Sequence, residues 1–145
     1  MQREERAIEL FKQKFNCSQA VFTAFRQADI LNEKDALKLS TVFGAGVAST
    51  GSGLCGAVTG ALMAISMCHG RGDLQSVEAK KTTYALGQRF MTEFKCCMGS
   101  CICEELLGLN IGAPENMSKA HEMKLFETRC RDAVKTASRI LEEIL

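Results

Sequence analysis

The chain has 145 residues, a formal net charge of +1 at pH 7, 46% hydrophobic residues and 24% charged residues. This size predicts a single domain covering 1–145, and the near-neutral charge gives no reason to expect nucleic acid as a partner. Eight cysteines accompany only two histidines. Any chemistry at a site of this protein is therefore expected to be sulfur chemistry.

The first helical pattern covers residues 3–29, where apolar side chains recur close to helical spacing. Asn16, Cys17 and Ser18 interrupt this run with residues that favour caps and turns. We therefore expect two helices that meet at Asn16, with Asn16 or Ser18 as the cap. Asn32 is the expected N-cap of the next helix.

Residues 42–68 carry no charge, and their length would suffice to span a bilayer. The first half is rich in Gly, Ser, Thr and Ala, which predicts a loop in which glycines adopt positive φ. The continuously apolar part is only Leu54–Cys68, so we expect a buried core helix and no membrane insertion. Gly56 and Gly60 make one face of this helix flat, and another backbone can pack closely there, within the chain or across a homodimer.

The second half of the chain is also helical in pattern. Asp73 is the expected cap of a helix over 74–95, and Ser100 is the expected cap of a short helix after the break at Gly99. Residues 119–145 are expected to form one closing helix. The fold prediction is an all-α bundle of about five or six helices, with a glycine-rich loop leading into a central small-residue helix.

The N-terminus is charged and lacks the apolar core of a signal peptide. We therefore expect a cytoplasmic protein, a setting in which standing disulfides are uncommon. Cysteines in such a protein indicate metal binding, redox catalysis or apolar packing rather than a disulfide scaffold.

Cys17, Cys55 and Cys103 lie near breaks in the helical pattern, and Cys130 lies about three turns into the last expected helix. Cys55 opens the small-residue helix, where unpaired N–H groups and the helix dipole favour a thiolate, so we expect it to be the most reactive thiol. Convergence of all four would suit zinc or an iron–sulfur cluster. Convergence of two would give a dithiol/disulfide couple, and convergence of none would leave small buried apolar residues.

The order Cys17, then Cys55-Gly-Ala-x-x-Gly60, then Cys103, then Cys130 resembles the C-GCAxxG-C-C family, which is named for a redox role. The resemblance covers nearly the whole chain, and the central motif is matched without departure. It implies that the four cysteines form one redox site, as catalytic thiols or as metal ligands, in an oxidoreductase or electron carrier. Related domains occur fused in multihaem and iron–sulfur electron carriers, which makes a cluster conceivable here. Neither the redox partner nor the cofactor follows from the sequence.

Gly53 and Gly56 lie on either side of the Leu54-Cys55 pair, and we expect them to let the backbone approach the thiols or a cofactor bound to them. The loop lacks the Gly-Lys-Ser/Thr of a P-loop, so a nucleotide site is not indicated.

A second group consists of Cys96, Cys97 and Cys101, which together with Cys103 place four thiols within eight residues. Such density suits a soft metal, so a metal-handling or metal-sensing module is an alternative function. A helical interaction domain with structural cysteines is a further alternative.

Overall fold

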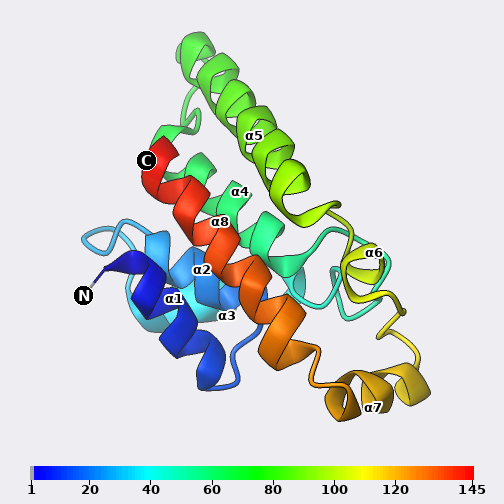
Figure 1. The fold of residues 1–145 in the computed structure, drawn as a ribbon. Helices are drawn as coiled ribbons and strands as arrows, with labels where there is room; N and C mark the ends of the chain where they lie inside the picture. Colours follow the sequence, from blue (N-terminus) through cyan, green and yellow to red (C-terminus); the bar gives the residue numbers. More distant parts are fainter. Residues whose placement is uncertain (1) are drawn as a thin grey trace.

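The computed structural model describes residues 2–145, and every regular element in this range is helical (Figure 1). The all-α prediction is confirmed. The described residues form eight α-helices, more than the five or six expected. In chain order these are α1 (Arg3–Lys12), α2 (Cys17–Phe25), α3 (Glu33–Ser40), α4 (Gly56–His69), α5 (Val77–Met98), α6 (Cys103–Leu107), α7 (Pro114–Glu122) and α8 (Arg131–Ile144). A 3₁₀ turn, η1 (Thr41–Phe43), follows α3, and a π-helical turn, η2 (Phe126–Cys130), precedes α8.

Helix α2 lies at the centre of the bundle and packs against α1, α3, α4 and α8, whereas α5 extends beyond the other helices (Figure 1). A capping box stabilises the first turn of α2. The Asn16 side chain accepts a hydrogen bond from the Gln19 N–H at 2.9 Å, and the Gln19 side chain accepts one from the Asn16 N–H at 3.0 Å. The expected break at Asn16 is thus confirmed.

The small-residue face of α4 packs on the start of α2 within the same chain. A Cβ atom at Gly56 would lie 2.9 Å from the Ser18 N and 3.0 Å from the Cys17 Cβ. A Cβ atom at Gly60 would lie 2.7 Å from the Ser18 carbonyl oxygen. These approaches require glycine. Because α2 already covers this face, the face itself gives no reason to expect a homodimer.

In the loop before α4, Gly46 and Gly51 have positive φ, as the glycines of this loop were expected to allow, and residues other than glycine have it too. Five successive residues, 45–49, have φ between 54° and 73°, and all but Gly46 carry side chains. Each such residue in an L-chain costs about 1–2 kcal/mol. Hydrogen bonds hold the turn, among them those from the N–H of Ala48 to Val42 O at 2.7 Å and from the N–H of Gly53 to Gly46 O at 2.9 Å.

The second half of the chain has different helix boundaries from those expected. Asp73 accepts hydrogen bonds from the N–H groups of Gln75 and Ser76 in a turn before the helix, so α5 begins at Val77. The expected closing helix is divided because Lys124, with φ of 56°, ends the run that begins in α7. Ile102 is the N-cap of α6 in place of Ser100, whose hydroxyl instead accepts a hydrogen bond from the Ile102 N–H at 2.9 Å.

None of the helices in residues 2–145 combines the length and the apolar character that crossing a membrane requires.

The close packing of α4 on α2 leads to a stability prediction for two matched substitutions in helix interiors. Gly60→Ala places a methyl group against the backbone of Ser18 and Phe22 and is expected to destabilise by about 1–3 kcal/mol. Gly87→Ala meets only the end of the Leu62 side chain, at 3.4 Å, and is expected to stabilise by about 0.5–1 kcal/mol because alanine favours helix. Thermal unfolding measures both. Equal melting temperatures for the two variants would show that α4 and α2 do not pack this closely.

Candidate functional site

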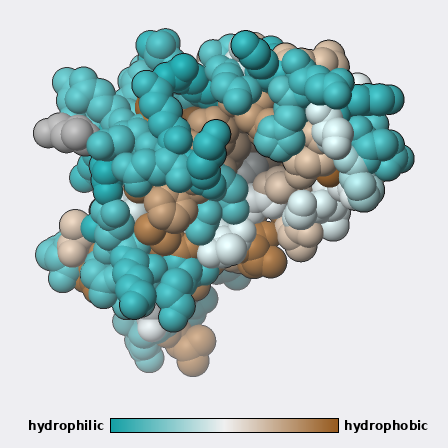
Figure 2. Space-filling view, turned by 90° about the horizontal axis from the view of Figure 1, so that it is seen from below, coloured by the Kyte–Doolittle hydropathy of each residue, from teal (hydrophilic) through white to brown (hydrophobic). Residues whose placement is uncertain are grey.

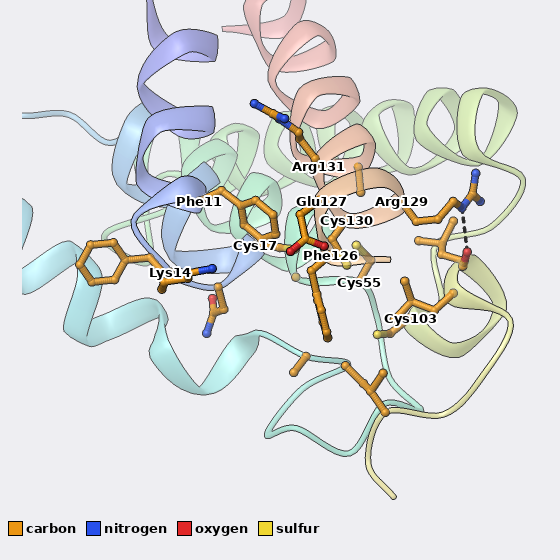
Figure 3. Close-up of a pocket in the computed structure, with 18 of the residues that line it drawn as sticks. Phe11, Lys14, Cys17, Cys55, Cys103, Phe126, Glu127, Arg129, Cys130 and Arg131 are labelled. Carbon is orange, nitrogen blue, oxygen red and sulfur yellow. Dashed lines mark hydrogen bonds between the residues drawn. The ribbon is translucent and has the colours of Figure 1, made fainter. Parts of the chain in front are cut away.

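The four candidate cysteines line one pocket of about 430 Å³. The pocket is bordered by the end of α1, the start of α2, and parts of α6, α7 and η2. Seen from below, the molecular surface has hydrophobic side chains in a hollow bordered by hydrophilic ones (Figure 2). In the close-up, Cys17, Cys55 and Cys130 lie close together, and Cys103 faces them from α6 (Figure 3). The apolar walls include Phe11, Phe15, Leu106, Leu107, Ile111, Met117 and Phe126.

Each of the four thiols lies where a helix begins. Cys17 is the first residue of α2, Cys55 is the N-cap of α4, and Cys103 is the first residue of α6. Cys130 ends the π-helical turn that leads into α8. Helix starts gathered at one end of the bundle therefore bring together residues separated by more than one hundred positions in the sequence.

A short antiparallel bridge between Leu54 and Ile102 fixes Cys55 relative to Cys103. The N–H of Cys55 donates to Cys101 O at 2.7 Å, and the N–H of Cys103 donates to Gly53 O at 3.0 Å. Gly53 thus acts through its carbonyl and does not line the pocket. Gly56 does line it.

Cys130 owes its position to the π-helical turn. Its N–H donates to Leu125 O at 3.0 Å, five residues back, whereas an α-helix would pair it four residues back. The neighbouring Arg129 donates from Nε to Leu106 O at 3.0 Å and so fastens this turn to α6. Turns of this kind are frequent at functional sites.

Cys17 is the thiol that joins the others, because its side chain interacts with both Cys55 and Cys130. Donation from the Cys17 thiol, together with the first-turn N–H groups of Ala57 and Val58, lowers the pKa of Cys55 although burial opposes this. The neighbouring Cys130 and Cys55 raise the pKa of Cys17 well above its ordinary value. The arrangement therefore favours a thiolate at Cys55 and keeps the proton on Cys17.

Cys103 lines the same pocket, but its pKa is shifted in the opposite direction from that of Cys55. Burial, followed by the nearby Cys55 and Cys130, raises its pKa to about 12. It is only 7% exposed, so in the reduced protein it is a neutral thiol that lies beside the reactive ones.

Charged side chains around the pocket were not identified from the sequence. Four cations line it, namely Lys12, Lys14, Arg129 and Arg131, against the single carboxylate of Glu127. They come from the end of α1 and from the η2–α8 junction, and only the fold brings these segments together. His121 also lines the pocket and packs against Phe126, with ring centroids 4.7 Å apart.

The other cysteine group does not assemble around Cys103. Cys96 and Cys97 are exposed at the end of α5, and the buried Cys101 thiol donates to Met91 O at 3.6 Å. Across residues 2–145, no three or more His, Cys, Asp or Glu side chains are arranged to hold a metal ion. The four thiols of the pocket have the donor chemistry of zinc or an iron–sulfur cluster.

Comparison with known protein families gives one match. The family model described as "Putative redox-active protein (C_GCAxxG_C_C)" matches residues 15–144, which is nearly the whole chain and includes all four thiols of the pocket. No curated protein and no solved structure shows significant similarity to it.

The thiol arrangement predicts the order in which the pocket cysteines are alkylated. In the reduced protein, the rate of Cys55 alkylation by iodoacetamide is expected to rise with an inflection below the pKa of an ordinary thiol, while Cys103 reacts slowly at pH 8. In Cys17→Ala the Cys55 inflection moves up, because the main cause of the lowered pKa is removed. In the control Cys68→Ala the inflection for Cys55 is expected at the same pH as in the wild-type protein, since Cys68 lies outside the pocket.

Peptide mapping by mass spectrometry distinguishes the cysteines in this experiment. An unchanged Cys55 inflection in Cys17→Ala would contradict the interaction between the two thiols.

Proposed function

We propose that this chain, which belongs to the family described as "Putative redox-active protein (C_GCAxxG_C_C)", is a thiol–disulfide oxidoreductase in which Cys55 is the nucleophile and Cys17 the resolving thiol. The observation that carries the proposal is that Cys17, Cys55 and Cys130 line one pocket, with the Cys17 Cβ atom against Gly56 at the start of α4 and the pKa of Cys55 lowered. A thiolate attacks disulfides, whereas a thiol does not.

The chemistry needs two steps that transfer two electrons in all. The Cys55 thiolate attacks one sulfur of a disulfide substrate, which forms a mixed disulfide and releases a thiolate. Cys17 then attacks the Cys55 sulfur, which closes an intramolecular disulfide and releases the second product with the Cys17 proton. The protein dithiol is oxidised and the substrate disulfide is reduced.

The raised pKa of Cys17 is consistent with attack by Cys55 first and by Cys17 second. In the resting protein the neighbouring Cys55 and Cys130 hold the pKa of Cys17 high, so Cys17 does not compete as the nucleophile. Once Cys55 is in a mixed disulfide its negative charge is gone, and one of the causes of the raised pKa is gone with it. Cys17 loses its proton more readily at the step in which it must attack.

Cys130 offers Cys17 a second partner, because Cys17 interacts with both. A disulfide between Cys17 and Cys55 can then exchange to one between Cys17 and Cys130, which restores the Cys55 thiolate. Cys103, with a pKa of about 12, acts in neither step in its neutral form.

Disulfide mapping after mild oxidation with diamide tests this function. The expected product has Cys17 linked to Cys55 or Cys130, with the bond reversed by dithiothreitol. Cys17→Ser is expected to lose both linkages, while Cys68→Ser, which alters a cysteine outside the pocket, keeps them. Thermal unfolding of each variant confirms that it is folded. Cys17 that remains free to alkylation in the oxidised wild-type protein would contradict the proposal.

Elemental analysis of protein prepared without oxygen addresses the metal alternatives. Iron or zinc in stoichiometric amount, lost in Cys17→Ser and retained in Cys68→Ser, would show that the pocket cysteines bind a metal. The dithiol function would then be wrong.

A further inference from the structure

We infer that the pocket takes a small organic disulfide whose substituents carry anionic groups, and this inference rests on the oxidoreductase function proposed above. The geometry of the pocket, the chemistry of its walls and the charges at its edge each restrict the substrate.

The position of Cys55 restricts the size of the substrate. Cys55 is 6% exposed and is reached through a pocket of about 430 Å³, a volume within the usual range for small-molecule sites of about 300–1,000 Å³. A disulfide must enter this space before the Cys55 sulfur can attack it. A substrate with short, flexible substituents meets this requirement, whereas a disulfide within a folded protein surface does not.

The walls and edge of the pocket restrict its chemistry. Phe11, Phe15 and Phe126 supply apolar surface for the methylene groups next to the disulfide. The lining residues carry four cations and one carboxylate, an excess of positive charge. The guanidinium groups of Arg129 and Arg131 point away from the sulfur atoms and the Glu127 carboxylate lies near them (Figure 3), so the positive charge closest to the thiols comes from the lysines. Lys14 has its ammonium group on the side of Cys17 (Figure 3). An excess of one sign in a hollow raises the local concentration of ligands of the opposite sign.

The step balances with this substrate as the only co-reactant. For RS–SR, the Cys55 thiolate forms a Cys55–SR bond as the S–S bond breaks and RS⁻ leaves. Cys17 then forms a bond to the Cys55 sulfur, and the second RS group leaves as RSH with the Cys17 proton. One disulfide is reduced to two small thiols, and two electrons pass from the protein.

Three small disulfides of similar size test the charge preference. These are the dianion 3,3′-dithiodipropionate, the neutral 2-hydroxyethyl disulfide and the dication cystamine. The pre-reduced protein reacts with each at low salt under anaerobic conditions, and each rate constant is divided by that of dithiothreitol with the same disulfide. This ratio removes differences in leaving-group pKa. The dianion is expected to exceed the neutral compound by about tenfold, and the dication to be the slowest.

Charge variants show whether the pocket is responsible. Lys14→Glu is expected to lower the ratio for the dianion several-fold relative to the ratio for the neutral disulfide, and thermal unfolding shows that the variant is folded. Lys80→Glu makes the same charge change on α5 outside the pocket and is expected to alter neither. The preference for the dianion should also weaken as salt is added.

The outcomes separate this inference from the function on which it rests. If none of the three disulfides oxidises the pocket cysteines, the oxidoreductase function is wrong and this inference falls with it. If all three react with equal ratios, or if cystamine is preferred, the function stands and the anionic substrate class is wrong. If the preference is present but Lys14→Glu leaves it unchanged, or if Lys14→Glu and Lys80→Glu weaken it equally, the charge of the pocket does not cause it, and the inference is overturned.

Discussion

The close packing of α4 on the first turn of α2 is the constraint on which the rest of the site depends. Gly56 and Gly60 have no side chains, so the backbone of α4 lies directly on Cys17, Ser18 and Phe22. Any side chain at Gly56 would occupy the space beside the Cys17 Cβ atom. The Cys-Gly-Ala-x-x-Gly motif therefore has two roles within six residues. Its cysteine supplies a thiol at the helix start, and its glycines let a second thiol approach it.

A second set of contacts brings the other two thiols to this pair. The bridge between Leu54 and Ile102 places α6 next to the start of α4, and Arg129 fastens the π-helical turn to α6 through Leu106 O. Five residues in the left-handed region, 45–49, turn the chain into Leu54. Backbone strain of this kind is kept only where the surrounding structure holds it, and it concentrates at functional sites. The strained turn, the bridge and the π-helical turn all lie within one side of the molecule, next to the four cysteines.

The sequence predicts the parts of this site that follow from local rules. Asn16 caps α2, Cys55 opens α4, and the glycine face of α4 packs closely, because capping chemistry and side-chain volume act over a few residues. These rules did not predict the left-handed turn, since Ala45, Val47, Ala48 and Ser49 all disfavour positive φ. They adopt it in a turn held by backbone hydrogen bonds such as that from the Ala48 N–H to Val42 O. The division of the last helix was missed for a similar reason: residues 119–145 have a continuous helical pattern, and the break at Lys124 leaves no proline or glycine as a signal.

The close α2–α4 contact also determines how far the structure must move when the proposed Cys17–Cys55 disulfide forms. A disulfide between Cys17 and Cys55 would join two helices whose backbones are already in contact. Closing it would require little movement, so the oxidised and reduced forms would differ mainly in the charge and bonding of the pocket. Cys130, by contrast, lies in a π-helical turn, where the hydrogen-bond pattern changes from that of the helix after it. If the disulfide moves between partners, we expect this turn to adjust while the α2–α4 contact stays fixed, since interiors packed without gaps resist small displacements.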